Sequence, residues 1–289
     1  MRLHGSDGLF SLAHTVAPVF WGGGRWPNVD WISNTFVWVG WENDEVVHRQ
    51  VTQRADGAVL IEGSAPSSGD EPWLVAVLGF DLEMPQFVDP LIAGLAAGMP
   101  GLRPFANGDL FDGLIGSIVG QSITVAAAAT TERRLASLVH PGIELFDRVF
   151  IPSPRHTSLA ELSVKEIRST GVTWRRAEAI STIAQLAADG GYPLQARRSD
   201  DEGVLRAFLR SLPLVGPWTA ESALLWGLGL PDIYPSGDVA LLRAARQTHS
   251  RPDMSMKDLD RLAPVWAPGR SWAARLLWTS LLGTAPVTD

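Results

Sequence analysis

The spacing of apolar residues changes near residue 85, and this change most constrains the fold. Before it, short runs rich in Val, Phe and Trp are separated by Gly, Pro, Asn and Asp, which is typical of β-strands joined by turns. After it, apolar residues recur every three to four positions, which is typical of amphipathic helices. The sequence therefore predicts an α+β protein, with an antiparallel β-rich N-terminal domain at 1–84 and a mostly α-helical region at 85–289.

The expected elements are short and closely spaced. A chain of 289 residues that is 46% apolar can bury cores in two or three domains. We expect strands at 10–19, 34–41, 44–53, 57–63 and 72–80, and helices at 86–98, 108–138, 158–169, 174–188, 201–211, 218–227, 237–247, 255–263 and 270–282.

Composition narrows the possible chemistry. The chain has no cysteine, which excludes disulfides, thiolate nucleophiles and zinc–thiolate sites. Its six histidines are scattered, so we expect no cofactor. No apolar run reaches the roughly 18 residues of a membrane span, and the N-terminal residues lack the apolar segment of a signal peptide. We therefore expect a cytoplasmic protein without a membrane partner.

The segment "VLRAFLRSLPLVGPWTAESALLWGLG" predicts two helices joined by a tight turn at Pro213 and Gly216. Free backbone N–H groups at the start of the second helix can bind a phosphate without any lysine. That matters because the net charge of −7 argues against a nucleic-acid partner, although it describes the whole surface and not one face. An ordinary helical hairpin is the alternative interpretation.

Asp238 lies in "PSGDV", about 22 residues after Gly216 and at the expected start of another helix. There is no basic residue between Leu212 and Leu242 to pair with it. Aspartate is a favoured helix N-cap, and it is also a common catalytic acid. From the residues alone, both roles stay open.

The combination of motifs resembles the helix-hairpin-helix DNA glycosylase superfamily, and most closely the bacterial 3-methyladenine DNA glycosylase II type. The resemblance covers about residues 72 to 280. It implies two helical lobes after the N-terminal domain, 105–230 and 85–104 plus 231–289, with Asp238 at the cleft between them. The motifs are the "LPLVGPWTA" hairpin followed by "PSGD", "FDGLIGSIVGQSITVAAAATTERRLASL", "GVTWRRAEAISTIAQLAADG", "WAPGRSWAARLLW", and the junction segments "VLGFDLEMPQF" and "PGLRPF".

This resemblance implies a monofunctional enzyme of base excision repair. Such an enzyme flips a damaged nucleotide, here an N-alkylated purine, out of double-stranded DNA and hydrolyses its glycosidic bond, which leaves an abasic site. Asp238 would stabilise the cationic sugar and orient or deprotonate water. One acid suffices for a leaving base that is already cationic, whereas ordinary glycosidases need a second. We expect a monomer that works at the nucleoid.

Bifunctional relatives carry a lysine two residues after the hairpin glycine, where it forms a Schiff base with the sugar. Here that position is Trp218, and the two lysines, Lys165 and Lys257, lie in other expected helices. This disfavours one alternative, a bifunctional 8-oxoguanine-type glycosylase/lyase. A second alternative, a non-catalytic helix-hairpin-helix module that binds distorted DNA, would not need Asp238.

The resemblance also implies further site residues. Ser222 and Val239 replace aromatic residues common in the nearest subgroup, which predicts a wider base pocket. For any single tryptophan, packing in the core is an alternative role. Leu214 replaces the usual first glycine of the hairpin. The implied base pocket consists of Trp218, Ser222, Val239, Trp272 and Trp278. The implied DNA contacts are Gln121, Ser122, Ile123, Leu214, Gly216 and Thr219, and either Gln121 or Ile123 would fill the gap in the duplex. A monovalent cation is implied on the backbone carbonyls of Arg210, Leu212 and Val215.

Overall fold

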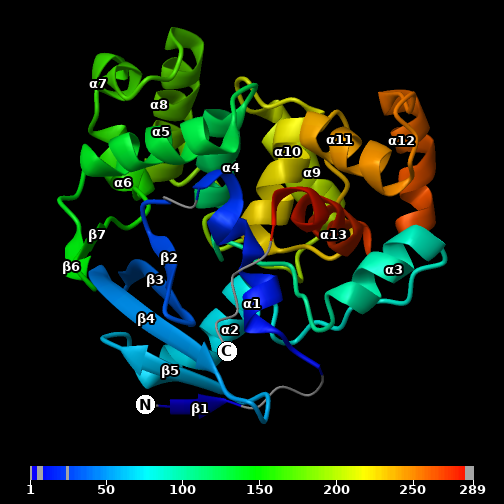
Figure 1. Cartoon of the computed structure of the whole chain (residues 1–289). Coiled ribbons are helices and arrows are strands. Elements are labelled where there is room, and N and C mark those ends of the chain that lie inside the picture. The colour runs from blue at the N-terminus through cyan, green and yellow to red at the C-terminus, as the bar shows by residue number, and fades with distance from the viewer. Residues whose placement is uncertain (1, 5–8, 24–25, 284–289) are drawn as a thin grey trace.

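The computed structural model describes residues 2–4, 9–23 and 26–283, and it has the expected α+β architecture. One antiparallel sheet lies beside a larger helical region (Figure 1). The strand order is β1-β5-β4-β3-β2. The strands are β1 (Arg2–His4), β2 (Val29–Ile32), β3 (Thr35–Glu42), β4 (Glu45–Gln53) and β5 (Val59–Gly63).

Two segments expected to be strands are helical. Residues 10–19 form α1 (Leu12–Thr15), capped by the Ser11 side chain, and then a 3₁₀ turn, Ala17–Gly23. Residues 72–80 belong to α2 (Asp70–Leu78), which has acidic residues in its first turn and ends at Gly79 with φ +59°. These capping signals overrode the strand-like apolar run. The apolar run of α2 instead packs against the sheet.

The helical region follows the predicted pattern, with two expected helices each divided. The helix expected at 108–138 is interrupted by a turn at residues 121–124, and the one expected at 158–169 is interrupted at 161–163. A small hairpin, β6 (Ile143–Leu145) and β7 (Arg148–Phe150), was not predicted. The helices are α3 (Pro90–Gly98), α4 (Leu110–Gly120), α5 (Val125–Ser137), α6 (His156–Ala160), α7 (Val164–Ser169), α8 (Trp174–Ala188), α9 (Glu202–Ser211), α10 (Pro217–Ala223), which continues into a π-helical turn at Leu224–Leu228, α11 (Val239–Thr248), α12 (Met256–Leu262) and α13 (Arg270–Leu282).

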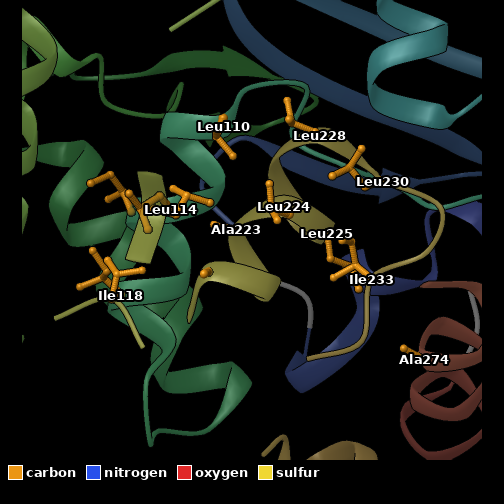
Figure 2. Packing of buried hydrophobic residues seen from close by; sticks show 14 of the residues in the cluster. Leu110, Leu114, Ile118, Ala223, Leu224, Leu225, Leu228, Leu230, Ile233 and Ala274 are labelled. Carbon is orange, nitrogen blue, oxygen red and sulfur yellow. The ribbon is translucent and has the colours of Figure 1, made fainter. Parts of the chain in front are cut away.

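The helix α4 and the end of the α10 segment pack at unusually close range. A Cβ atom added to Gly113 would lie 2.4 Å from the Cα atom of Gly227, so only glycine permits this approach. Around this contact, Leu110 and Leu114 of α4 face Leu224 and Leu228 of the π-helical turn in the main apolar core (Figure 2). The close packing fixes α4 against the segment that begins at the predicted hairpin.

The two larger apolar clusters mostly follow the expected division of the chain. One joins the sheet, α1 and α2 with Phe105, and the other joins the helices from α3 onward with Trp21. A third, small cluster joins Val37 and Val39 of β3 to Phe150 of β7. We therefore propose 1–84 and 85–289 as domains. Within the second, α5 to α8 lie on one side and α3, α11 and α12 on the other, with α9 and α10 between them (Figure 1). This arrangement supports the proposed lobes, 105–230 and 85–104 plus 231–289.

In the described part of the chain, no helix combines the length and apolar character needed to cross a membrane.

Candidate active site

Asp238 is the N-cap of α11, and its side chain also accepts hydrogen bonds from other helices. Its Oδ1 atom accepts a hydrogen bond from the backbone N–H of Leu241 at 2.6 Å, which satisfies a free donor of the first turn. Gly237, just before it, has φ +87° and lets the chain turn sharply into the helix. The capping bond uses one oxygen and leaves Oδ2 free for other donors.

Two indole groups hold this carboxylate from different helices. Trp218 of α10 donates its Nε1 hydrogen to Oδ2 of Asp238 at 2.9 Å, and Trp278 of α13 donates to Oδ1 at 3.3 Å. With the cap, three donors compensate the negative charge and fix the direction of both oxygens. Trp218 comes from one proposed lobe and Trp278 from the other, so Asp238 lies where the two lobes meet.

A cavity of about 540 Å³ opens beside Asp238, a volume in the range of small-molecule sites. Four of the five predicted pocket residues line it: Trp218, Ser222, Val239 and Trp278. Ser222 is buried and leaves room where an aromatic ring would fill space, whereas Val239 is 75% exposed. These four residues and Asp238 therefore share the wall of one cavity.

The prediction that Trp272 lines the base pocket is wrong, because this residue does not line the cavity. Its side chain is 2% exposed and its indole donates to the carbonyl oxygen of Leu102 at 3.0 Å, inside the apolar core. Trp272 and Trp278 are six positions apart on α13, which places them about 120° apart around the helix axis. Only Trp278 can then face Asp238.

Further tryptophans complete the aromatic wall of the cavity. Trp226 stacks on Trp278 with ring centroids 5.8 Å apart and planes 20° apart, and Trp21 meets both rings edge-on at 5.9 Å. Trp26 and Trp38 line the cavity from the N-terminal domain. Sequence reasoning missed these residues, because three of the four lie in the N-terminal domain, far from the recognised motifs.

Two carboxylic acids outside the predicted site also line the cavity: Asp112 of α4 and Glu132 of α5. Burial and, to a smaller extent, the charge of Asp109 raise the pKa of Asp112 to about 7, and Ser153 donates to its Oδ2 atom at 3.0 Å. Burial and the charge of Asp112 raise the pKa of Glu132 to about 8. Both acids therefore hold protons at pH values where exposed carboxyl groups are ionised.

The turn between α4 and α5 carries the residues predicted to fill the gap in the duplex. The Gln121 side chain donates to the carbonyl oxygen of Leu214 at 3.1 Å and to Oγ1 of Thr219 at 2.9 Å. Its own carbonyl oxygen accepts from Arg176. In this structure the Gln121 side chain is held against the hairpin, and its role in filling the gap stays a prediction. Ser122 is exposed with φ +55°, and Ile123 is 40% exposed.

The hairpin predicted to bind phosphate joins α9 to α10. Gly216 is the N-cap of α10, and a Cβ atom added to it would meet nothing within 4 Å. Pro217 follows at the first helical position, and the first amides of the helix lack partners within it. Leu214 takes φ +64°, the left-handed conformation that explains the usual glycine. Thr219 is buried, and its hydroxyl oxygen accepts the hydrogen bond from the Gln121 side chain.

The carbonyls predicted to hold a cation lie at the end of α9 and in the hairpin. The carbonyl oxygen of Leu212 accepts from the Val215 N–H at 3.3 Å, and Arg210 is in the last turn of α9. A cation on the Arg210, Leu212 and Val215 carbonyls stays a prediction. Among the described residues, no group of three or more His, Asp or Glu side chains could hold a metal ion.

Comparison with known proteins finds similar DNA glycosylases. No protein-family model matches the sequence. DNA-3-methyladenine glycosylase 2 of Escherichia coli is 30% identical over 219 residues, 73% of this chain and 74% of that protein. A 3-methyladenine DNA-glycosylase structure from Archaeoglobus fulgidus has a TM-score of 0.81 at 18% identity and covers 96% of this chain and 97% of that one. An 8-oxoguanine glycosylase/lyase of Clostridium acetobutylicum, in complex with double-stranded DNA, has a TM-score of 0.75 at 15% identity, with 96% of each chain covered. These structures confirm the expected fold.

Proposed function

Because this chain belongs to the DNA-3-methyladenine glycosylase II family of helix-hairpin-helix DNA glycosylases, we propose that it excises N-alkylated purines from double-stranded DNA as a monofunctional enzyme. The product is an abasic site in an uncut strand. The observation that carries this proposal is the carboxylate of Asp238, held by two indole donors in the wall of an aromatic cavity.

The chemistry that this geometry supports is hydrolysis through a cationic sugar. As the bond between C1′ and the base nitrogen breaks, its electron pair moves into the base and positive charge develops on the sugar. The fixed carboxylate of Asp238 stabilises that charge, since it is ordered before the reaction begins. Asp238 then accepts the proton of the water whose oxygen bonds to C1′.

The aromatic wall supports recognition of an alkylated base. A purine methylated at N3 or N7 carries a positive charge while still linked to DNA, and indole faces attract cations. The rings of Trp218 and Trp278 line the cavity and contact Asp238 through their edges. A flipped base bound beside them would have its sugar close to the carboxylate, and its charge makes it a good leaving group.

DNA binding by the hairpin is tested through Gly216. The open space around its missing Cβ atom supports a direct approach of a phosphate to the backbone amides. Gly216→Asp places a negative side chain there and should weaken binding to any duplex by tenfold or more. Gly94→Asp is the matched control, since Gly94 on α3 is exposed and also has open space around it. Equal affinity of the two folded variants would remove the hairpin from the interface.

The turn at residues 121–124 is proposed to contact the gap left by the flipped base. With Gln121 bonded to the hairpin, Ile123 is the exposed apolar side chain of this turn. We assign the gap-filling role to Ile123. Its replacement by alanine should weaken binding to abasic DNA more than binding to undamaged duplex.

Base release is the experiment that tests the proposed activity. Under single-turnover conditions, the protein should release 3-methyladenine from a methylated duplex and leave alkali-sensitive abasic sites. A protein that binds the duplex and releases no base would be the non-catalytic binding module. We also propose that it acts as a monomer, because one chain carries the cavity, the acid and the hairpin.

A bifunctional glycosylase/lyase is the second candidate, favoured by the likeness to the Clostridium structure. A lyase needs an amine near the sugar, but the position two residues after Gly216 is Trp218, whose indole bonds to Asp238. Lys165 and Lys257 lie on α7 and α12. Borohydride should therefore trap no covalent complex with damaged DNA, and a trapped adduct on either lysine would favour the lyase.

A further inference from the structure

Glu132 is the unexplained polar group of the cavity. Its carboxyl lines the cavity from α5 and has no hydrogen-bond partner among the described residues. Its Oε1 atom lies so close to α4 that a Cβ atom added to Gly116 would be 3.3 Å away. A partly buried carboxyl without a partner costs free energy. That cost is offset if a ligand in the cavity provides the partner.

The neighbours of Glu132 determine its protonation. Burial is the larger cause and the charge of Asp112 from α4 the smaller one, and together they raise the pKa of Glu132 to about 8. Asp112 is itself hydrogen-bonded to Ser153 and Asn107, and the charge of Asp109 acts on it. At neutral pH, Glu132 is therefore a carboxylic acid with a proton to donate.

The two acids of the cavity are thus suited to different tasks. Asp238 is surrounded by three donors and can only accept. A cationic base needs no further help to leave, but an uncharged base would leave as an anion unless an acid protonates it. In glycoside hydrolysis a second carboxylic acid supplies that proton.

We propose that Glu132 is the general acid that protonates the flipped base when that base carries no charge. This inference rests on the proposed function. The carboxyl hydrogen of Glu132 moves to a ring nitrogen of the base while the C1′–N electron pair enters the ring. The base leaves neutral, the sugar cation takes a water oxygen, and the water proton goes to Asp238. Glu132 regains its proton from solvent.

Two duplex substrates test this role in the same protein. One contains hypoxanthine, an uncharged purine, and the other contains cationic 3-methyladenine. Glu132→Gln keeps the shape of the side chain and removes the proton, so hypoxanthine release should fall roughly 10²- to 10⁴-fold. Release of 3-methyladenine should stay within a few-fold, which also shows that the variant is folded. Glu178→Gln, at an exposed position on α8, is the matched control and should change neither rate.

The pH dependence of the unaltered protein is a second test that needs no variant. Because Glu132 is the acid below a pKa of about 8, hypoxanthine release should fall as the pH rises above that value. Release of 3-methyladenine needs no such acid and should not follow this profile. Equal pH profiles, equal rates in Glu132→Gln, or no hypoxanthine release by the unaltered protein would each overturn the inference. Failure to release either base would instead overturn the proposed function.

Discussion

Asp238 and Glu132 are carboxylic acids in the wall of one cavity, and their surroundings give them opposite properties. Asp238 stands at a helix start and receives three hydrogen bonds, two of them from tryptophans. Glu132 stands within α5, has no donor among the described residues and lies near another acid. Donors stabilise a carboxylate, whereas burial beside a negative charge stabilises the neutral acid. The side-chain type therefore predicts neither role, and the neighbours predict both.

The largest expected effect comes from Asp238→Asn. Asparagine retains the shape but not the charge that faces a sugar that becomes cationic only as the bond breaks. Single-turnover release of 3-methyladenine should fall roughly 10²- to 10⁴-fold, while damaged-DNA affinity stays within a few-fold. The side-chain oxygen can still cap α11, so the free energy of unfolding should change by only about 1 kcal/mol. Comparable release rates would show that Asp238 is only a cap and end the contrast with Glu132.

A smaller effect is expected from Trp218→Phe, which retains an aromatic face and removes the donor to Oδ2 of Asp238. A hydrogen bond to a charged group contributes about 1.5–3 kcal/mol, which corresponds to a loss of roughly 10- to 100-fold in base release. Trp26→Phe is the matched control, because Trp26 lines the same cavity but its indole donates to the carbonyl of Pro18. Equal losses in the two variants would mean that the indole bond does not matter.

The smallest expected effect is on stability, from Glu132→Gln. The pKa of Glu132 is about 8 in the folded protein, and near 4.3 in an unfolded chain. Between these values the folded state holds a proton that the unfolded state releases, so stability falls as pH rises through this window. Glutamine removes this dependence. Over the three pH units from 5 to 8 the full effect would be about 4 kcal/mol, and partial exposure of Glu132 reduces it. The variant should therefore be about 1–3 kcal/mol more stable than the parent at pH 8 and nearly equal to it at pH 5.

Chemical denaturation at the two pH values measures this difference, with Glu178→Gln as the control. A Glu132→Gln variant with the same pH dependence as the parent would show that the carboxyl is ionised in the folded state. The two acids of the cavity would then be alike, and the division of roles between them would be wrong.

Local sequence signals predicted the parts of the site that depend on short stretches of chain. The helix at 174–188 was predicted with its observed bounds, because Thr173 caps it and its apolar spacing is regular. Asp238 and Trp218 were named because the hairpin and "PSGD" motifs resemble those of the helix-hairpin-helix DNA glycosylases. The helices at 12–15 and 70–78 were missed, since an apolar run of that length fits a strand equally well.

Contacts between distant segments were beyond sequence reasoning. Trp21 reaches the cavity from the N-terminal domain, and no spacing within one element links it to Trp278. Glu132 lies in a segment rich in alanine and arginine, where an acid ordinarily faces solvent. Its burial follows from the packing of α5 on α4, where its Oε1 atom lies beside Gly116. Trp272 was misplaced because a motif does not state which face of the helix is inside.

Gln121 has a mechanical consequence for the search along DNA. Its side chain links the exposed turn at Ser122 and Ile123 to the hairpin at Leu214 and Thr219, and Arg176 holds its carbonyl from α8. The turn that would contact the base stack and the hairpin that would bind the backbone are thus held at a fixed distance from each other by these hydrogen bonds. The turn would therefore contact base pairs at a constant distance from the phosphate bound by the hairpin. Each step of the protein along the strand would place the turn at the next base pair.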